Sequence, residues 1–441
     1  MRFRFSTKGL RDSTRPSPLV FCKLCMKSIR IKLLAFTALV TVGTLGCTPV
    51  ELLTAASSPT GRPPLVVTKR ARPELAKNAN PKKLKAAVTA LNTYSAKKYR
   101  EVAQQAKGNL VLSPLGPFLL DQMLYESSQG ASEKTLALDL KRADYGTAEL
   151  SELCWQLSAN PSLVVNNALF VEPELGLREA ATRKLTAAFD ITAESRPLGS
   201  DPEAANRYLD AWVAKATQGR YTSLPTPVDP QHTIVLLSTL VFQNRWTSEF
   251  SPEETKPAPF HLSDGTAVEV PTMEKQESHS VQLVKVEQGD GVALSFWNGA
   301  ELVFLLPHPG VSPDQLLEKL EFPDAKEYPP VTLYLPRFEF EAPTVPLAST
   351  TIASADLKPL LAKPGETPLL LNTYQKAKIR VDEEGAEAAA VTELMGTPAA
   401  AMSPMPPKIL RFDRPFAFVL RDRETGAVLL MGRVENPLAK G

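Results

Sequence analysis

The chain carries few of the side chains that usually perform covalent chemistry in enzymes. Its 441 residues include four histidines, His232, His261, His279 and His308. None of them belongs to an H-E-x-x-H zinc motif, and the sequence has no G-x-S-x-G nucleophile elbow, no P-loop and no dinucleotide-binding glycine fingerprint. We therefore expect that the protein is not an enzyme, and we expect neither a metal ion nor a cofactor.

The cysteine spacing indicates export rather than a metal or redox centre. Cys22 and Cys25 form a C-x-x-C pair, a spacing found in zinc and redox sites. From Met26, however, a basic head leads into the apolar run 33–45, which is short for a membrane span and typical of a signal peptide. Translation then starts at Met26, or the pair is lost with the signal. Cys154 would remain as a buried, inert thiol.

The apolar run ends T-L-G-C, which is similar to the bacterial lipobox, in which the signal is removed and the cysteine is acylated. Thr44 departs from the pattern, which prefers Leu. We expect residues 1–47 to be the signal region and Cys47 to carry lipid, which predicts an outer-membrane or cell-surface lipoprotein. Ordinary secretion to the extracellular space is the alternative.

Residues 48–81 contain six prolines and no hydrophobic periodicity, which predicts a linker ahead of a folded domain, residues 82–441. Residues 62–100 contain eleven Lys or Arg and a single acid, Glu74. This excess predicts a solvated tail and helix face, with a polyanion or membrane-surface patch as the alternative. The net charge of the whole chain is only +2, so nucleic acid is not expected as a partner.

The composition indicates a folded protein, with 43% hydrophobic and 22% charged residues. Buried or alternating strands are predicted at 234–242, 302–306 and 331–335, and a helix is predicted around 84–94. Helices and strands interleave without a strict βαβ rhythm, which favours an α+β fold.

The stretch 379–392 reads I-R-V-D-E-E-G-A-E-A-A-A-V-T. Its Glu and Ala residues favour a helix, but Gly385 and the β-branched residues favour an extended chain. In an extended chain Ala386, Ala388 and Ala390 share one face that carries no charge. The segment could therefore lie exposed as a loop or enter a sheet with that face against a core.

The run 383–390, E-E-G-A-E-A-A-A, resembles the hinge of the reactive loop in serpins, protease inhibitors that insert this loop into their main sheet. Flanking segments resemble serpin segments in the same order. They are N-L-V-L-S-P (109–114), Q-G-A-S-E-K-T (129–135), V-N-N-A-L-F-V (165–171), W-V-A-K-A-T-Q-G-R-Y (212–221), F-Q-N-R-W-T-S-E-F (242–250), V-P-T-M (270–273), L-V-F-L-L-P (302–307), L-P-R-F (335–338), F-D-R-P-F (412–416) and L-L-M-G-R-V-E-N-P (429–437).

The resemblance covers about residues 84–437 and implies the serpin fold. This is an α+β architecture with a large central mixed β-sheet, smaller sheets, about eight or nine helices and an exposed reactive-centre loop at about 383–408. The hinge residues implied are Glu383, Glu384, Gly385, Ala386, Glu387, Ala388, Ala389, Ala390, Val391 and Thr392.

The resemblance also implies a function, inhibition of an extracytoplasmic serine or cysteine protease. The protease would cleave the loop, form an acyl-enzyme and be trapped when the cleaved arm inserts as a strand. We expect a monomer. The alternative is a non-inhibitory serpin-fold lipoprotein that binds a partner or has a structural role.

Family spacing, counted from Glu383, places the reactive bond between Ala399 and Ala400, which suits elastase-like or subtilisin-like targets. Counting back from the later prolines places it between Met402 and Ser403, which would favour a chymotrypsin-like or elastase-like target.

Three positions depart together from the family pattern. Gln375, Ser238 and Gly116 stand near places where serpins usually have His, Asn and Ser, a polar cluster beneath the point where the sheet parts. The resemblance implies that the hydrogen bonding there is rewired.

Overall fold

A computed structural model gives the structure of the chain. It describes residues 52–54, 65–68, 70–320, 329–342, 345–346, 354–365, 369–370, 374–375, 377–386 and 406–440. All of these belong to the unit Val50–Gly441. The predicted leader, Cys47 and both candidate reactive bonds lie outside the described residues.

Six α-helices and three short 3-10 helices occur in the described residues. They are α1 (Pro81–Ala103), α2 (Leu115–Ser127), α3 (Gly130–Asp139), α4 (Thr147–Ser158), α5 (Glu179–Phe189), α6 (Pro202–Ala216), η1 (Ala76–Asn78), η2 (Pro252–Glu254) and η3 (Pro313–Leu317). Helix α1 begins where Asn80 caps it, accepting from the backbone N–H of Lys82 at 2.9 Å, with Pro81 in the first turn. This helix contains the predicted helical stretch 84–94, and its Leu91 and Tyr94 are buried.

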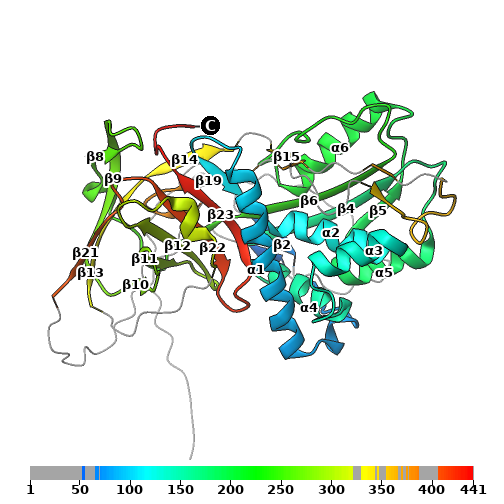
Figure 1. Cartoon of the computed structure of the whole chain (residues 1–441), viewed down its shortest axis with the longest axis horizontal. Helices are drawn as coiled ribbons and strands as arrows, with labels where there is room; N and C mark the ends of the chain where they lie inside the picture. Colours follow the sequence, from blue (N-terminus) through cyan, green and yellow to red (C-terminus); the bar gives the residue numbers. More distant parts are fainter. Residues whose placement is uncertain are drawn as a thin grey trace, which may run out of the picture. The chain divides into compact units, whose positions relative to one another are not determined.

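Two larger sheets form one end of the unit (Figure 1). The six-stranded sheet has the order β10-β11-β12-β22-β23-β3 and the four-stranded sheet the order β21-β13-β9-β8. Their strands are β3 (Leu110–Leu112), β8 (Lys256–His261), β9 (Ala267–Ser278), β10 (Val281–Val284), β11 (Gly289–Ser295), β12 (Ala300–Pro307), β13 (Val331–Pro336), β21 (Lys408–Arg411), β22 (Phe416–Asp422) and β23 (Val428–Val434).

A third sheet has three strands, β5 (Ile191–Ser195), β4 (Leu163–Val171) and β6 (Ile234–Phe242), in the order β5-β4-β6. Strand β4 is parallel to β5 and antiparallel to β6. Alternate residues face opposite ways, so Phe170 packs with Leu209 of α6, whereas Leu169 belongs to the main core with α2. Figure 1 shows α6 on one side of this sheet and α2 on the other.

A long antiparallel pair runs beside this sheet in three described pieces. Strand β14 (Phe338–Glu341) pairs with β19 (Lys378–Val381), β15 (Val345–Pro346) with β18 (Tyr374–Gln375), and β16 (Ser354–Ala355) with β17 (Leu369–Leu370). Two further pairs are β7 (Asn244–Arg245) with β20 (Gly385–Ala386), and β1 (Leu52–Thr54) with β2 (Val66–Thr68).

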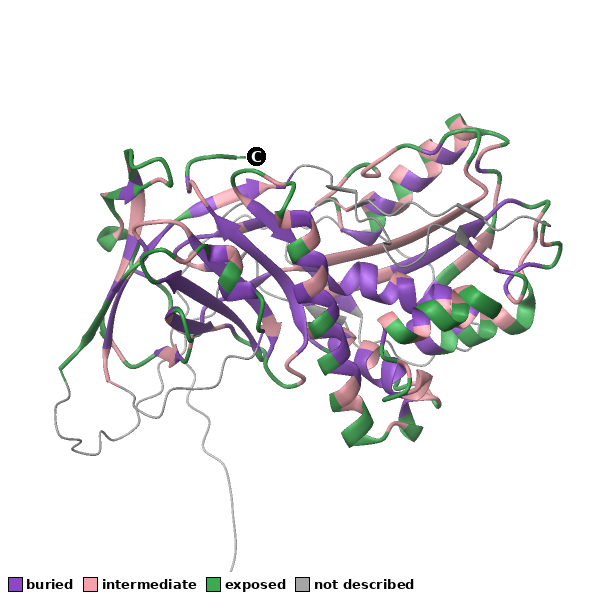
Figure 2. Ribbon diagram, in the orientation of Figure 1, coloured by how far each residue is buried: buried purple, intermediate pink, exposed green. Residues whose placement is uncertain are grey.

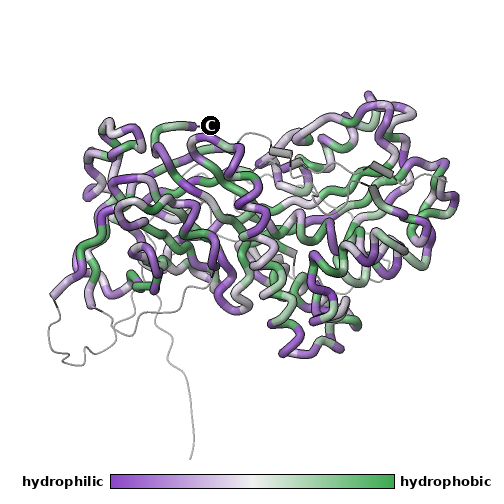
Figure 3. The backbone as a smooth tube through the Cα atoms, viewed as in Figure 1, coloured by the Kyte–Doolittle hydropathy of each residue, from purple (hydrophilic) through white to green (hydrophobic). Residues whose placement is uncertain are grey.

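The core lies between these sheets and the helices (Figure 2), and hydrophobic residues follow the strands through it (Figure 3). A cluster of phenylalanines joins the long pair to the six-stranded sheet, with Phe338 and Phe416 in edge contact at 5.8 Å between ring centroids. The predicted α+β class is confirmed.

The described part of the expected linker packs on this unit. Leu65 and Val67 are buried, and Arg72 forms an ion pair with Glu152 of α4. The prolines and the lack of periodicity favoured a spacer here. These contacts could not be predicted from them, because the partner residues lie far along the chain.

In the part of the chain that the structure describes, no helix is both long and apolar enough to cross a membrane.

Candidate functional site

The first four predicted hinge residues turn away from β19 at Asp382. The Asp382 carboxylate accepts from the backbone N–H of Glu384 at 3.1 Å and of Gly385 at 3.2 Å, and the Asp382 N–H donates to the Gly385 carbonyl at 3.1 Å. These bonds make a tight Asx-type turn. The other carboxylate oxygen accepts from Arg380 Nε at 2.9 Å. The turn points the chain back toward β7. Residues 387–392 of the predicted hinge lie outside the described part.

Gly385 lies against the backbone of β7. It pairs with Arg245 in an antiparallel register, and Ala386 pairs with Asn244. A Cβ on Gly385 would stand 2.3 Å from the Asn244 carbonyl oxygen and 2.7 Å from the Arg245 Cα, well inside contact distance. Only glycine fits at this approach without moving backbone.

Trp246 binds the Asp382 turn through two hydrogen bonds. Its indole N–H donates to the Asp382 carbonyl at 2.9 Å, and its backbone N–H donates to the Glu384 carbonyl at 3.0 Å. The ring is 1% exposed and stacks on Phe296 with centroids 4.3 Å apart. Trp246 therefore packs in the core and also holds the hinge.

Glu383 is buried, and its side chain and carbonyl both have hydrogen-bond partners. Its carboxylate accepts from Thr255 Oγ1 at 2.8 Å and lies 3.5 Å from Arg337, and its carbonyl accepts from the Phe250 N–H at 2.9 Å. The ammonium of Lys275 braces the neighbouring segment by donating to the carbonyls of Ser248 and Glu249 at 2.8 and 2.7 Å. Burial lowers the pKa of Lys275 to about 8.

Glu384 has an incompletely satisfied carboxylate. Burial, and then the neighbouring Asp382, raise its pKa, while Arg245 opposes the shift. Its Oε2 has no hydrogen-bond partner among the described residues, and neither have Nε and Nη1 of Arg245, whose Nη2 pairs with Glu249. The backbone of the hinge is therefore held at Asp382, Glu383 and Glu384, whereas the Glu384 side chain is incompletely hydrogen-bonded among the described residues.

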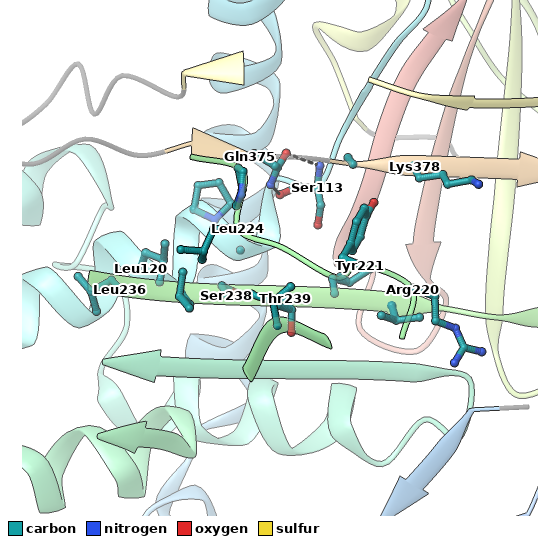
Figure 4. A pocket seen from close by; sticks show the side chains of 18 of the residues that line it. Ser113, Leu120, Arg220, Tyr221, Leu224, Leu236, Ser238, Thr239, Gln375 and Lys378 are labelled. Carbon is teal, nitrogen blue, oxygen red and sulfur yellow. Dashed lines mark hydrogen bonds between the residues drawn. The ribbon is translucent and has the colours of Figure 1, made fainter. Parts of the chain in front are cut away.

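Beyond the hinge, β6 has a strand partner on only one side in the described part, where it pairs with β4. A cavity of about 270 Å³ lies between its other edge and the long pair. It is lined by β6, by Gly116 and Leu120 of α2, by the segment 220–228, and by Gln375 and Lys378 from β18 and β19 (Figure 4). We call this cavity the slot. Apolar residues of β6 such as Leu236 and Leu240 are only half-buried beside it.

The three positions that depart from the family pattern meet at the slot. Gln375 donates from Nε2 to the Ser113 carbonyl at 2.6 Å and accepts the Ser113 N–H at 2.8 Å (Figure 4). Ser238 Oγ is buried and has no hydrogen-bond partner among the described residues. It would lie 3.3 Å from a Cβ on Gly116. At the slot, the amide of Gln375 thus binds both backbone groups of Ser113, and the Ser238 hydroxyl has no partner among the described residues.

In the described part, no three His, Cys, Asp or Glu side chains are grouped so that they could hold a metal ion. Cys154 is partly exposed on its surface, but burial of its sulfur raises the pKa of the thiol to about 12, while nearby Arg70 opposes the shift, so the thiol is neutral. Sequence reasoning named Glu383 to Ala386 of the hinge. It missed the roles of Asp382, Thr255 and Arg337, which only the fold brings to the hinge.

The fold places the predicted hinge residues between the end of β19 and β7. The family described as Serpin (serine protease inhibitor) matches residues 89–437, so the chain belongs to the serpin family. Members of this family are mostly inhibitors of serine proteases rather than catalysts.

The curated relatives align with this chain over most of their own length. Alpha-1-antitrypsin 1-3 of Mus musculus is 29% identical over 382 residues, which cover 79% of this chain and 89% of the mouse protein. An uncharacterized serpin-like protein of Thermococcus kodakarensis is 27% identical over 379 residues, covering 80% of this chain and 86% of that protein.

Solved structures show the same fold. Serpin48 of the insect Tenebrio molitor superposes with a TM-score of 0.68 at 24% identity, covering 81% of this chain and 99% of that one. The native stressed conformation of AtSerpin1 from Arabidopsis gives a TM-score of 0.67 at 21% identity, covering 81% and 99%. The predicted serpin fold is confirmed.

Proposed function

We propose that this serpin inhibits serine endopeptidases outside the cytoplasm by loop cleavage, acyl-enzyme trapping and strand insertion into the slot. The observation that carries the proposal is the edge of β6 that has no strand partner among the described residues. This edge faces β18 and β19 across the slot, and the chain continues from β6 into β7, where the hinge already pairs. An unpaired strand edge beside half-buried apolar side chains favours the addition of a strand.

The hinge pairing predicts a register for insertion. Gly385 opposite Arg245 and Ala386 opposite Asn244 are the first two rungs of an antiparallel pair. Continued down β6 without a bulge, the same register sets Ala388 opposite Phe242, Ala390 opposite Leu240 and Thr392 opposite Ser238. Residues opposite each other share a face of the sheet.

This register gives each face of the inserted strand its environment. Ser238 lies beside Gly116 of α2, so Ala388, Ala390 and Thr392 would face that buried side. Thr392 would bring a hydroxyl to the unused Ser238 Oγ. Glu387 and Glu393 would face the opposite side, across from Gln243 and Leu237, so neither carboxylate would lie against α2. Burying an unpaired charge would oppose insertion strongly, so the sequence suits this register.

The test is to incubate the full-length protein with pancreatic elastase, chymotrypsin and subtilisin, followed by a denaturing gel and intact mass. A covalent adduct with release of a C-terminal peptide would support inhibition, and the peptide mass would choose between Ala399–Ala400 and Met402–Ser403 as the reactive bond. Cleavage without adduct, and without a gain in heat resistance, would favour the alternative of a non-inhibitory binding or structural serpin.

We also propose export through the signal region 1–47 and lipid attachment at Cys47. The supporting observation is the T-L-G-C sequence after an apolar run. Incorporation of labelled palmitate into the wild type but not into Cys47→Ser would support it, and equal incorporation would contradict it.

A polyanion surface at the exposed Lys82, Lys83 and Lys85 of α1 is part of the same proposal. Faster adduct formation with added heparin would support that part.

A further inference from the structure

A segment ahead of the first helix crosses the three-stranded sheet and continues to α4. We call residues 65–73 the strap; all of them except residue 69 are described. Leu65 and Val67 are buried against Val241 of β6 and Val164 of β4, whereas Val66 between them is 47% exposed. This alternation is that of an extended chain with one face against a surface.

Gln218 clamps the start of the strap. Its side-chain amide accepts the Val66 N–H at 2.9 Å and donates to the Val66 carbonyl at 2.8 Å. Gln218 follows α6 and has a φ of +50°, in the left-handed region that a glycine usually fills. A residue other than glycine held in this conformation is often retained for its side chain. Here the side chain binds the strap as a neighbouring β-strand would.

The other end of the strap is fixed to α4. Arg72 Nε donates to Glu152 at 2.8 Å, and the Arg72 guanidinium lies 5.3 Å from the centre of the Trp155 ring. The Trp155 indole N–H donates to the Arg70 carbonyl at 3.3 Å, and Arg70 pairs with Asp190 at the end of α5. The strap thus joins the β6 side of the slot to α4 and α5.

The length of the strap restricts where β6 can lie. Between Val67 and Arg72 an extended chain spans at most about 17 Å. A shift of β6 toward β18 and β19 would narrow the slot and would carry Val241 with it. The strap contacts Val241 of β6 at one end and Glu152 of α4 at the other, so such a shift would change the separation of its two ends.

We propose that the strap is a brace that holds β6 at the separation from β18 and β19 at which a strand fits. Strap docking and loop insertion then favour each other, because coupling between two sites is reciprocal. The docking half of this inference stands alone, and the coupling half rests on the proposed insertion.

Cys154 provides a reporter of strap docking. It lines a cavity of about 390 Å³ together with Trp155 and the strap residues Arg70, Ala71 and Pro73. With the strap docked, the thiol is neutral and partly covered, so it reacts slowly with alkylating agents. Release of the strap removes three residues from this wall and exposes the thiol.

The first experiment measures alkylation of Cys154 by iodoacetamide in the full-length protein, with the modified peptide quantified by mass spectrometry. Leu65→Asp places a charge on the buried face of the strap, and Val66→Asp places the same charge on the exposed face. We expect labelling of Cys154 to be about tenfold faster in Leu65→Asp and changed by less than about twofold in Val66→Asp. Gln218→Gly, which keeps the backbone conformation but removes the clamp, should also accelerate labelling. Equal rates in the two Asp variants would overturn the docking.

The second experiment measures the coupling. After loop cleavage by elastase, Cys154 of the wild type should be labelled about fivefold more slowly than before cleavage, and Leu65→Asp should take at least about three times longer than Val66→Asp to acquire heat resistance. Equal times in the two variants would overturn the brace while leaving docking intact. If the cleaved wild type gains no heat resistance, the proposed insertion falls and the brace falls with it, whereas the labelling result before cleavage still reports on docking.

Discussion

The indole N–H of Trp246 donates to the carbonyl of Asp382 at 2.9 Å, and this bond joins the hinge turn to the end of the strand that borders the slot. The ring is fully enclosed and stacked on Phe296. One side chain therefore connects the hydrophobic core to the turn at Asp382.

Trp246→Phe keeps an aromatic ring over Phe296 but removes the donor to Asp382. We expect the free energy of unfolding to fall by about 1–3 kcal/mol, since a buried carbonyl loses its partner. Urea unfolding followed by circular dichroism measures this change. Trp246→Ala, which also leaves a cavity, should cost about 3–5 kcal/mol. An unchanged stability in Trp246→Phe would show that the bond does not hold the turn.

The proposed register distinguishes neighbouring positions of the hinge. Ala388→Glu would bury a charge against α2 and should abolish covalent adduct formation while leaving the loop cleavable. Ala389→Glu carries the same charge on the opposite face and should retain most of the adduct. Quantifying adduct and cleaved product on denaturing gels with the same protease gives both values. Equal loss in both variants would contradict the register.

Gln375 is bound to the backbone of Ser113 through both ends of its amide. Gln375→Leu removes both bonds and leaves the two backbone groups of Ser113 facing the slot. We expect the native form to lose about 1–3 kcal/mol of unfolding free energy. Gln375→Glu keeps the acceptor for the Ser113 N–H but loses the donor to the Ser113 carbonyl. Its loss of stability, measured by thermal unfolding, should therefore lie between those of the wild type and Gln375→Leu. A Leu variant as stable as the wild type would show that these bonds do not secure β18.

Asp121 is a buried acid of α2 that accepts a hydrogen bond from the Tyr94 hydroxyl at 2.7 Å. Burial, only partly offset by this bond, raises the pKa of Asp121 from 3.8 to about 6. The folded state therefore holds this proton more tightly than the unfolded state does. Unfolding free energy should fall as pH rises from about 4 to about 6, by at most about 3 kcal/mol from this group.

Asp121→Asn keeps an acceptor for Tyr94 without the ionisation. The unfolding free energies of wild type and Asp121→Asn are measured by urea at pH 4, 5, 6 and 7. Between about pH 4 and 6 the wild type should lose stability relative to the variant, and above about pH 6 the difference between them should stay constant. A difference that does not change with pH would contradict the raised pKa.

Local sequence predicted an extended segment with one uncharged face and an α+β fold, and the family resemblance implied the hinge. The run from Glu383 to Ala390 shows small uncharged residues on one face of an extended chain, and a period of two is visible without any partner. The family resemblance then supplied the order of the flanking segments and indicated that Gln375, Ser238 and Gly116 would lie together. Each of these inferences depends on residue types at short spacing.

The tertiary structure, by contrast, decided which partners these residues contact. Gln375 holds Ser113, 262 positions away, and Trp246 holds Asp382, 136 positions away. The strap is the clearest case, because the stretch 65–81 has the composition of a linker and yet Val66 is bound by Gln218, 152 positions further on. A short extended segment has no periodicity strong enough to reveal a docking surface. Its burial depends on the complementary face that the fold assembles from β4, β6 and the turn after α6, and no local pattern in the sequence records that face.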